Sequence, residues 1–182
     1  MEWTLPGTVL AVPRQETDLV EERLKALFLA GGISLSQVAG ITGLEPYTVQ
    51  NWVKRGFLSP PVNKRYSLTQ LCRIITINML KKVLPMERIC GMLGYINGQL
   101  NDESDDMIDD SRLYFLFVSL AARAKEVDRD RDALLNKALS GYAEPVPGAA
   151  ERIKTVLKIM LTAYLAARMQ QEADTQLKNI HL

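Results

Sequence analysis

Two Ser-x-x-Gln sequences constrain the fold of this chain more than any other feature. Ser34 and Gln37 form the first, and Ser67 and Gln70 form the second. In such a capping box, each of the two side chains satisfies a backbone N–H at the start of a helix. Apolar residues follow both boxes at helical spacing, and strand signals are nearly absent. The sequence therefore predicts an all-α protein whose helices begin at defined residues.

Glycine and proline divide the segment after the first capping box into two short helices. Gly43 ends the first helix where the turn needs a permissive backbone, and Pro46 suits the first position of the second helix. Ala39 is small and lets the two helices cross closely. The apolar contacts between them are expected from Leu44, Val49 and Trp52. This spacing predicts a helix-turn-helix over residues 34–55, with an ordinary helical hairpin as the alternative.

Polar and basic side chains lie on the outward face expected for the second helix. Gln and Asn amides pair with adenine edges, and Lys and Arg neutralise phosphates. Residues 57–66 contain Pro60 and Pro61, which exclude a helix and leave room for a small β-hairpin, or wing; a plain surface turn is the alternative. We expect double-stranded DNA to contact Tyr47, Thr48, Gln50, Asn51, Lys54 and Arg55 on the helix, and Lys64 and Arg65 on the wing.

Charge is unevenly distributed along the 182 residues, although the net charge is only +1. Residues 33–90 hold eight Lys or Arg and two Glu, whereas residues 91–140 hold ten acidic and six basic residues. Basic charge concentrated in one segment is typical of proteins that bind polyanions. The distribution favours DNA as a partner, although short basic segments also serve only to solubilise a protein.

The order of these motifs resembles the DNA-binding domain of the MerR family of bacterial regulators. The matching positions are Thr48, Val49 and Trp52 in the second helix, Gly56, Phe57 and Leu58 before the wing, Tyr66 and Ser67 after it, and Leu71, Ile89 and Leu93 in the helices that follow. Gln50 and Asn51 depart from the family, which usually has Arg and often an aromatic residue there. The resemblance covers residues 33–93 and implies a winged helix-turn-helix. The whole chain is similar to a bacterial family of unknown function, DUF1836, which implies a regulator without a defined ligand.

The remaining segments carry weaker signals. Residues 1–16 look irregular, and an apolar-rich helix is expected over 109–126, continuing or restarting to 139. A long last helix is expected over 149–177. The chain is predicted to be all-α with a small β wing, divided into an N-terminal arm and helix (1–32), the winged helix-turn-helix (33–94), an acidic linker (95–106) and a helical dimerisation or sensing module (107–182).

The last predicted helix carries an apolar stripe that has more than one interpretation. Its members are Ile153, Val156, Leu157, Met160, Leu161, Tyr164 and Leu165. We expect the stripe to pack partly within the chain, and to contribute to a homodimer interface or to an effector pocket. The pocket would be lined by Phe115, Phe117, Met160 and Tyr164. A single winged domain makes few phosphate contacts, which favours the homodimer.

Nothing in the sequence indicates an enzyme. Phosphate-binding loops, serine-hydrolase motifs and zinc-protease motifs are absent, and the only histidine, His181, is the penultimate residue. Asp128, Asp130 and Asp132 begin like a calcium loop, but Ala133 and Leu139 stand where Gly and Glu are needed. We therefore predict no catalytic residues, no metal site and no cofactor, and any small-molecule effector stays undefined.

Location and function are the last expectations. No apolar run approaches the roughly 20 residues of a membrane span, and two cysteines are too few for a disulfide framework, which predicts a cytoplasmic protein. The function predicted is a sequence-specific transcriptional regulator that acts by occupying operator DNA. The alternative is a protein-interaction adaptor, in which the apolar C-terminal helices bind a partner and the helix-turn-helix is a scaffold that does not bind DNA.

Overall fold

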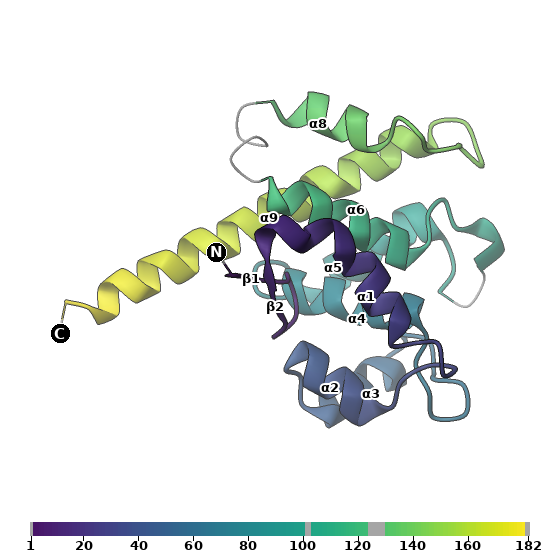
Figure 1. Cartoon of the computed structure of the whole chain (residues 1–182). Coiled ribbons are helices and arrows are strands. Elements are labelled where there is room, and N and C mark those ends of the chain that lie inside the picture. Colours follow the sequence, from purple (N-terminus) through teal and green to yellow (C-terminus); the bar gives the residue numbers. More distant parts are fainter. Residues whose placement is uncertain (1, 101–102, 124–129, 181–182) are drawn as a thin grey trace.

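The computed structural model describes residues 2–100, 103–123 and 130–180, which form a mostly helical protein with one two-stranded antiparallel sheet (Figure 1). The strands are β1 (Glu2–Thr4) and β2 (Ala11–Pro13), and two 3-10 helices are η1 (Arg14–Leu19) and η2 (Glu103–Asp105). The α-helices are α1 (Val20–Ala26), α2 (Leu35–Thr42), α3 (Pro46–Lys54), α4 (Leu68–Leu80), α5 (Met86–Asn97), α6 (Asp110–Ala122), α8 (Arg131–Ala138) and α9 (Ala149–Lys178).

Helix α4 is the centre of the hydrophobic core. Its start is the second capping box, since Ser67 Oγ accepts a hydrogen bond from the Gln70 N–H and Gln70 Oε1 accepts one from the Ser67 N–H, which confirms that prediction. Every residue from Leu71 to Leu80 except Asn78 is buried. Helix α4 packs against α2, α5, α6 and α9. One continuous core therefore joins the region before the predicted acidic linker to the region after it.

The predicted domain boundaries fall within this shared core. Helix α5 continues to Asn97, so the first residues of the predicted linker are helical. Ile96 is fully buried, and Ile108, just after the linker, is 3% exposed. The division into separate functional modules stays a prediction.

The N-terminal segment is more regular than its sequence indicates. The expectation of an irregular segment is wrong for the strands at residues 2–4 and 11–13 and for the 3-10 helix that begins at Arg14. Strands β1 and β2 pair with Trp3 opposite Val12. The indole Nε1 of Trp3 donates a hydrogen bond to the hydroxyl of Tyr164 on α9 at 3.0 Å. The sheet is thus held by a contact across almost the whole chain, which local sequence patterns do not reveal.

The predicted wing is a tight turn with little strand structure. Val62 and Arg65 exchange backbone hydrogen bonds of 3.1 and 2.9 Å, and Asn63 and Lys64 between them have positive φ angles of 49° and 62°. A second isolated bridge joins Ile33 to Tyr66. The regular β structure of the described residues lies at the N-terminus, whereas the segment expected to form the β wing, residues 57–66, takes part only in these two isolated bridges.

The C-terminal helices match the predictions in part. Helix α6 ends at Ala122, four residues before the expected end at Glu126, which itself lies outside the described residues. Helix α8 restarts at Arg131, and α9 has nearly the predicted bounds. The residues proposed for an effector pocket are buried core residues, and the rings of Phe117 and Tyr164 meet edge to face at 5.7 Å. These residues pack against their neighbours, and an effector pocket at the stripe stays a prediction.

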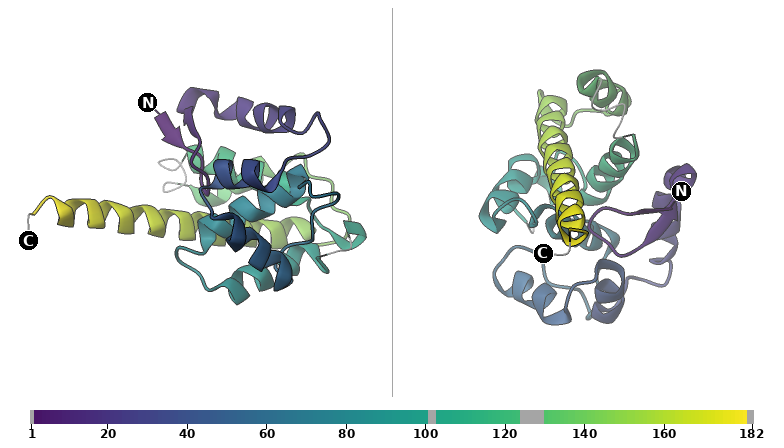
Figure 2. Two further views of the ribbon diagram at one scale, coloured as in Figure 1. Left: turned by 90° about the horizontal axis from the view of Figure 1, so that it is seen from below. Right: turned by 90° about the vertical axis from the view of Figure 1, so that its left-hand side faces the viewer.

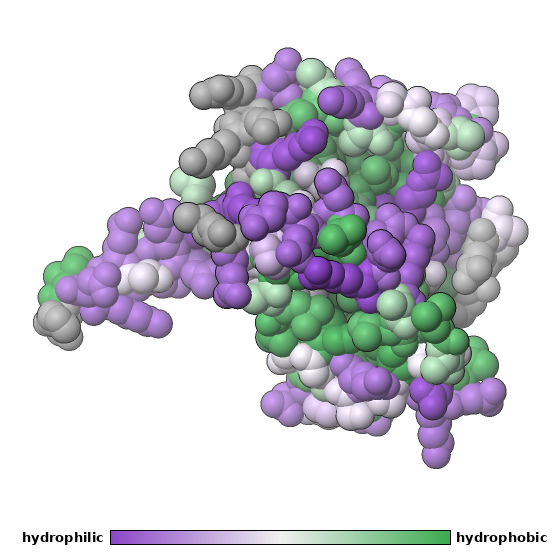
Figure 3. All heavy atoms as spheres, in the orientation of Figure 1, coloured by the Kyte–Doolittle hydropathy of each residue, from purple (hydrophilic) through white to green (hydrophobic). Residues whose placement is uncertain are grey.

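The C-terminal part of α9 projects beyond the rest of the molecule (Figure 2). The stripe from Ile153 to Tyr164 is buried within the chain, whereas every residue from Arg168 to Lys178 is exposed. The surface of this projection is mostly hydrophilic (Figure 3). No helix among the described residues is both long enough and apolar enough to cross a bilayer.

Candidate nucleic-acid interface

The pair α2–α3 forms where local sequence signals require it. Ser34 and Gln37 make the predicted capping box, with the Gln37 Oε1 accepting from the Ser34 N–H at 2.9 Å. Gly43 follows α2 in the left-handed conformation at φ 69°, and its N–H donates to the carbonyl of Ala39 at 2.8 Å. A side chain at Gly43 would also meet Val9 at 2.7 Å. The prediction of a break at Gly43 is confirmed.

Helix α3 begins at Pro46 and is held by one buried edge. Val49 is fully buried and Trp52 is 4% exposed. Leu44 in the connecting turn and Val38 on α2 are also buried. Val53 is partly buried and also packs against the core, so the polar side of α3 is the side that faces outward.

The outward side of α3 carries most of the sequence-predicted contact residues. Tyr47 is 69% exposed, and Gln50, Asn51 and Lys54 are also exposed, while Thr48 is half-buried. Within the described part of the chain, these five side chains make no hydrogen bond or ion pair to another side chain. Helix α3 lies at one end of the molecule, away from α8 (Figure 1). We call this set, Tyr47, Thr48, Gln50, Asn51 and Lys54, the α3 face.

Three further predicted residues lie close in sequence but differ in their partners. Arg55 follows α3, stacks over the ring of Phe57 at 4.6 Å and pairs with Glu87 at 3.6 Å. Both side chains of that pair are more than half exposed, so it is a weak interaction. Arg65 donates from Nη1 to the carbonyl of Gly32 at 3.0 Å. Lys64 is exposed at the tip of the turn.

Two residues that support this region were missed by the sequence analysis. The side chain of Asn78 donates to the carbonyls of Gly7 and Thr42, at 2.9 and 3.0 Å, and so joins the N-terminal turn to the end of α2. The ammonium of Lys81 lies 5.4 Å from the centre of the Trp52 ring, and burial together with Lys82 lowers the pKa of Lys81. The signal for Asn78 in the sequence is its amide side chain within the mostly apolar stretch 74–80.

Metal chemistry has no support in the described residues. They contain no group of three His, Cys, Asp or Glu side chains placed to hold a metal ion. Asp128 lies outside the described residues, so the calcium-like start at Asp128, Asp130 and Asp132 is only partly described. Asp130 caps α8 by accepting from the Ala133 N–H at 3.0 Å, and Asp132 pairs with Lys158. These two carboxylates therefore have structural partners.

Fold and surface define a mostly helical protein with a polar helix face at one end. The chain belongs to the family of the domain of unknown function DUF1836, whose model matches residues 15–117. The match begins in η1 and ends in α6, and it therefore includes α3, the turn after it and the central helix.

One curated relative is also similar to this chain. The uncharacterized protein YkrK of Bacillus subtilis (strain 168) is 29% identical over 86 residues, which is 45% of this chain. The matched part spans 37% of that relative. No solved structure matches the chain.

Proposed function

We propose that this protein is a sequence-specific DNA-binding transcriptional regulator that acts by occupying operator DNA. The observation that carries the proposal is the α3 face: an exposed helix side whose amide and ammonium groups have no partners within the described chain. Such groups can bind bases and phosphates without first breaking a hydrogen bond or ion pair within the protein. The pair α2–α3 would act as a MerR-like helix-turn-helix, with α3 in the major groove.

Each predicted residue has a role in this proposal. Tyr47, Thr48, Gln50 and Asn51 would face the base edges, since amides can pair bidentately with adenine. Lys54, Arg55, Lys64 and Arg65 would contact phosphates, with the turn at residues 62–65 acting as the wing. Arg55 would exchange its weak pair with Glu87 for a phosphate.

A homodimer is part of the same proposal. One helix-turn-helix makes few phosphate contacts, and dimers bind two half-sites about one helical turn apart. The apolar stripe from Ile153 to Tyr164 is buried within the chain, so the dimer contact would come from other parts of the C-terminal helices. Such a regulator would act in the cytoplasm, where its operator is.

Selection of genomic DNA fragments on the purified protein, followed by sequencing, tests the proposal. We expect an enriched motif near physiological salt, and a palindromic or repeated motif would also give the half-site spacing of the dimer. No retention of DNA even at low salt would overturn the proposal and favour the protein-interaction adaptor.

A charge-matched pair of double variants tests the wing. We expect Lys64→Ala with Arg65→Ala to weaken binding to all sequences and to lower the salt slope by about 1.8, which corresponds to two phosphate contacts. Lys137→Ala with Lys178→Ala removes the same charge from α8 and α9 and should leave the slope unchanged. Equal slopes for the two double variants would remove the wing from the proposal.

A further inference from the structure

Three polar side chains of the central helix α4 bind the backbone of the region that would contact DNA. They are Gln70, Arg73 and Asn78, and each donates a hydrogen bond to a carbonyl outside its own helix. A carbonyl in a turn or at a helix end has no regular partner, so a side-chain donor determines where that piece of backbone lies. Helix α4 therefore holds three connections around α3 and the wing.

Asn78 holds the end of α2. Its Nδ2 donates to the carbonyl of Thr42, the last residue of α2, at 3.0 Å and to the carbonyl of Gly7 at 2.9 Å. The Thr42 carbonyl needs such a donor, because the last four carbonyls of an α-helix have no partner within the helix. The N–H of Val9, in the same N-terminal turn as Gly7, donates to the Ile41 carbonyl at 2.9 Å. The end of α2 is thus bound both to α4 and to the N-terminal turn.

The N-terminal turn is itself fixed to the core. The Pro6 carbonyl accepts a hydrogen bond of 2.9 Å from the hydroxyl of Tyr114 on α6, and Tyr114 is fully buried. Gly7 has a φ of 77°, and a Cβ there would collide with the carbonyl oxygen of Ile75 on α4. The turn is therefore seated directly on α4. Because α3 follows α2 after a short turn and packs against it, these contacts also set the direction of the α3 face.

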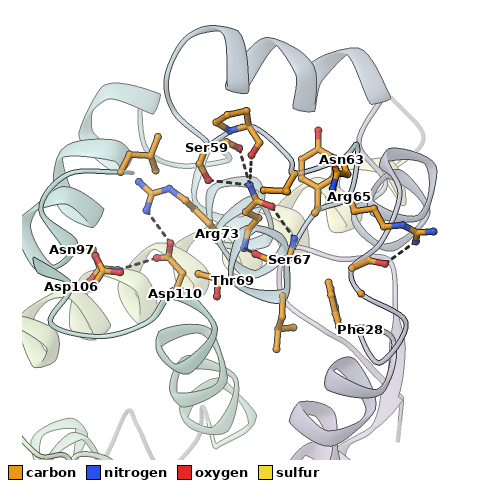
Figure 4. Close-up of a pocket in the computed structure, with 18 of the residues that line it drawn as sticks. Phe28, Ser59, Asn63, Arg65, Ser67, Thr69, Arg73, Asn97, Asp106 and Asp110 are labelled. Carbon is orange, nitrogen blue, oxygen red and sulfur yellow. Dashed lines mark hydrogen bonds and ion pairs between the residues drawn. The ribbon is translucent and has the colours of Figure 1, made fainter. Parts of the chain in front are cut away.

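Gln70 holds the segment before the wing. Its Nε2 donates to the carbonyls of Ser59 and Pro60, each at 3.0 Å, while its Oε1 accepts from the Ser67 N–H in the capping box (Figure 4). Both ends of the amide are used, so its orientation is defined. Ser59 and Pro60 also line an open cavity of about 870 Å³, where packing does not hold the segment. The hydrogen bonds from Gln70 hold it instead.

Arg73 makes the third contact and has a second role. Its Nε donates to the carbonyl of Phe57, just after α3, at 3.3 Å. Its Nη1 pairs with Asp110 on α6 at 3.0 Å, and Asn97 Nδ2 donates to the same carboxylate at 3.4 Å (Figure 4). Substitution of Arg73 would therefore also break a buried ion pair. The other two side chains are uncharged, and their substitution separates positioning from that effect.

We propose that Gln70 and Asn78 are positioning residues of the DNA-binding site, which fix the α3 face and the wing relative to each other through α4. This inference rests on the proposed function. The α3 face and the wing must meet one duplex at the same time, so DNA binds the arrangement in which their relative position fits. A chain that populates this arrangement for only a fraction of the time binds DNA more weakly by that fraction.

The affinity for the selected DNA tests the role of Asn78. Asn78→Ala removes both hydrogen bonds, and we expect binding to weaken by about tenfold, which corresponds to a fitting arrangement populated about a tenth of the time. The salt slope and the selected motif should stay those of the wild type, because no phosphate or base contact is lost. Leu135→Val shortens a buried side chain on α8 and is the control for destabilisation alone, so it should leave DNA affinity unchanged.

Three outcomes would overturn this role. They are unchanged DNA affinity in a folded Asn78→Ala variant, a changed salt slope or motif, and equal weakening by Leu135→Val. Thermal unfolding checks that each variant is folded at the assay temperature. If Asn78→Ala does not fold, Thr8→Val loosens the same turn, because the Thr8 hydroxyl donates to the Leu5 carbonyl and accepts from the Leu10 N–H. Unchanged DNA affinity in folded Thr8→Val would then overturn the role.

Amide hydrogen exchange tests the positioning without DNA. Asn78→Ala should speed exchange in residues 35–54 by about tenfold and leave exchange in α8 unchanged. Gln70→Glu keeps the capping acceptor but loses the donor, so it should speed exchange in residues 57–66. Gln37→Glu makes the same substitution in the first capping box and should not. Wild-type exchange in both regions of the folded variants would overturn the proposal.

The two measurements separate this inference from the proposed function. If exchange rises as expected but the wild-type chain retains no DNA, the proposed function fails, while the hold of α4 on α2 and on the segment before the wing is supported. If the wild-type chain binds DNA and the variants match it in exchange and in affinity, the positioning role fails, while the proposed function stands.

Discussion

The α3 face and the buried cluster of Arg73, Asn97 and Asp110 are both polar, but they differ in burial and in partners. The side chains of the α3 face are exposed or half-buried, and they form no hydrogen bond or ion pair with another side chain of the described chain. In the cluster, Arg73 and Asp110 are paired at 3.0 Å out of contact with most solvent. Removing a side chain from the α3 face should leave the folded state intact, whereas removing Arg73 or Asp110 alone leaves the other as a buried charge without its partner. Binding and stability should therefore respond to different substitutions.

The largest expected effect is on the buried cluster. Arg73→Met should reduce the free energy of unfolding by about 3–5 kcal/mol, because Asp110 is then left buried without its partner. Urea unfolding measures the loss. Adding Asp110→Leu to Arg73→Met should recover most of it.

The matched control for this prediction is Arg88→Met. Arg88 is exposed on α5, so its substitution should change stability by less than about 0.5 kcal/mol. If Arg73→Met lowered the free energy of unfolding no more than this control, the ion pair between Arg73 and Asp110 would contribute little to stability. The distinction between the two regions would then fail.

The second prediction concerns the α3 face. If the proposed function holds, Asn51→Ala should reduce discrimination at one base pair by about 1–3 kcal/mol, because the proposed pair between its amide and a base edge is lost. Sequencing of the DNA selected by the variant gives the change in the motif. Asn136→Ala on α8 is the control, and an unaltered motif for Asn51→Ala would remove this residue from base recognition.

The third prediction sharpens the comparison at two adjacent carboxylates. Burial raises the pKa of Asp110, and Arg73 opposes this effect. Partial burial also acts to raise the pKa of Asp109, but hydrogen bonds from Ser111, Thr69 and the backbone N–H groups of Ser111 and Arg112 outweigh it and lower that pKa. A lowered pKa in the folded state gives stability that is present at neutral pH and is lost as the pH falls below about 4.

Asp109→Ala should therefore cost about 1 kcal/mol at neutral pH, as expected for the loss of a helix cap. The difference from the wild type should shrink in acid, when the wild-type carboxylate is protonated. Urea unfolding at several pH values measures it. Asp109→Asn keeps a hydrogen-bond acceptor for these N–H groups and should lose less stability than Asp109→Ala. If the stability lost in Asp109→Ala did not change with pH, the negative charge of Asp109 would not be the source of the stabilisation.

The smallest expected effect is on stability at the α3 face. Gln50→Ala should change the free energy of unfolding by less than about 0.5 kcal/mol, because the exposed side chain has no partner in the described chain. Circular dichroism during urea unfolding measures it. A destabilisation above 1 kcal/mol would show that Gln50 supports the fold, and would weaken its assignment to DNA.

Local sequence signals predicted much of the helical fold. The boxes at Ser34 and Ser67, the break at Gly43 and the start at Pro46 each depend on neighbouring residues, so they are visible in the sequence. The N-terminal sheet was missed because its strands have three residues each and Trp3 depends on a partner 161 residues away. Propensity carries no information about such a contact.

The basic segment shows the limit of counting charge in the sequence. Residues 33–90 carry a clear positive excess, but the structure buries Arg73 against Asp110 and places Arg55 near Glu87. The positive charge left for the proposed contact with DNA is therefore smaller than the count indicates. The exposed positions on α3 were predicted correctly because helical periodicity alone determines which side of a short helix faces outward.

The turn between Val62 and Arg65 has a consequence for protein engineering. A lysine at φ 62° is less favourable than a glycine by about 1 kcal/mol, since its Cβ crowds the backbone in the left-handed region. A screen for heat resistance should therefore enrich glycine at residue 64. A screen for variants that bind DNA should keep lysine at this position. Comparing the two screens therefore shows whether residue 64 contributes to thermal stability or to DNA binding.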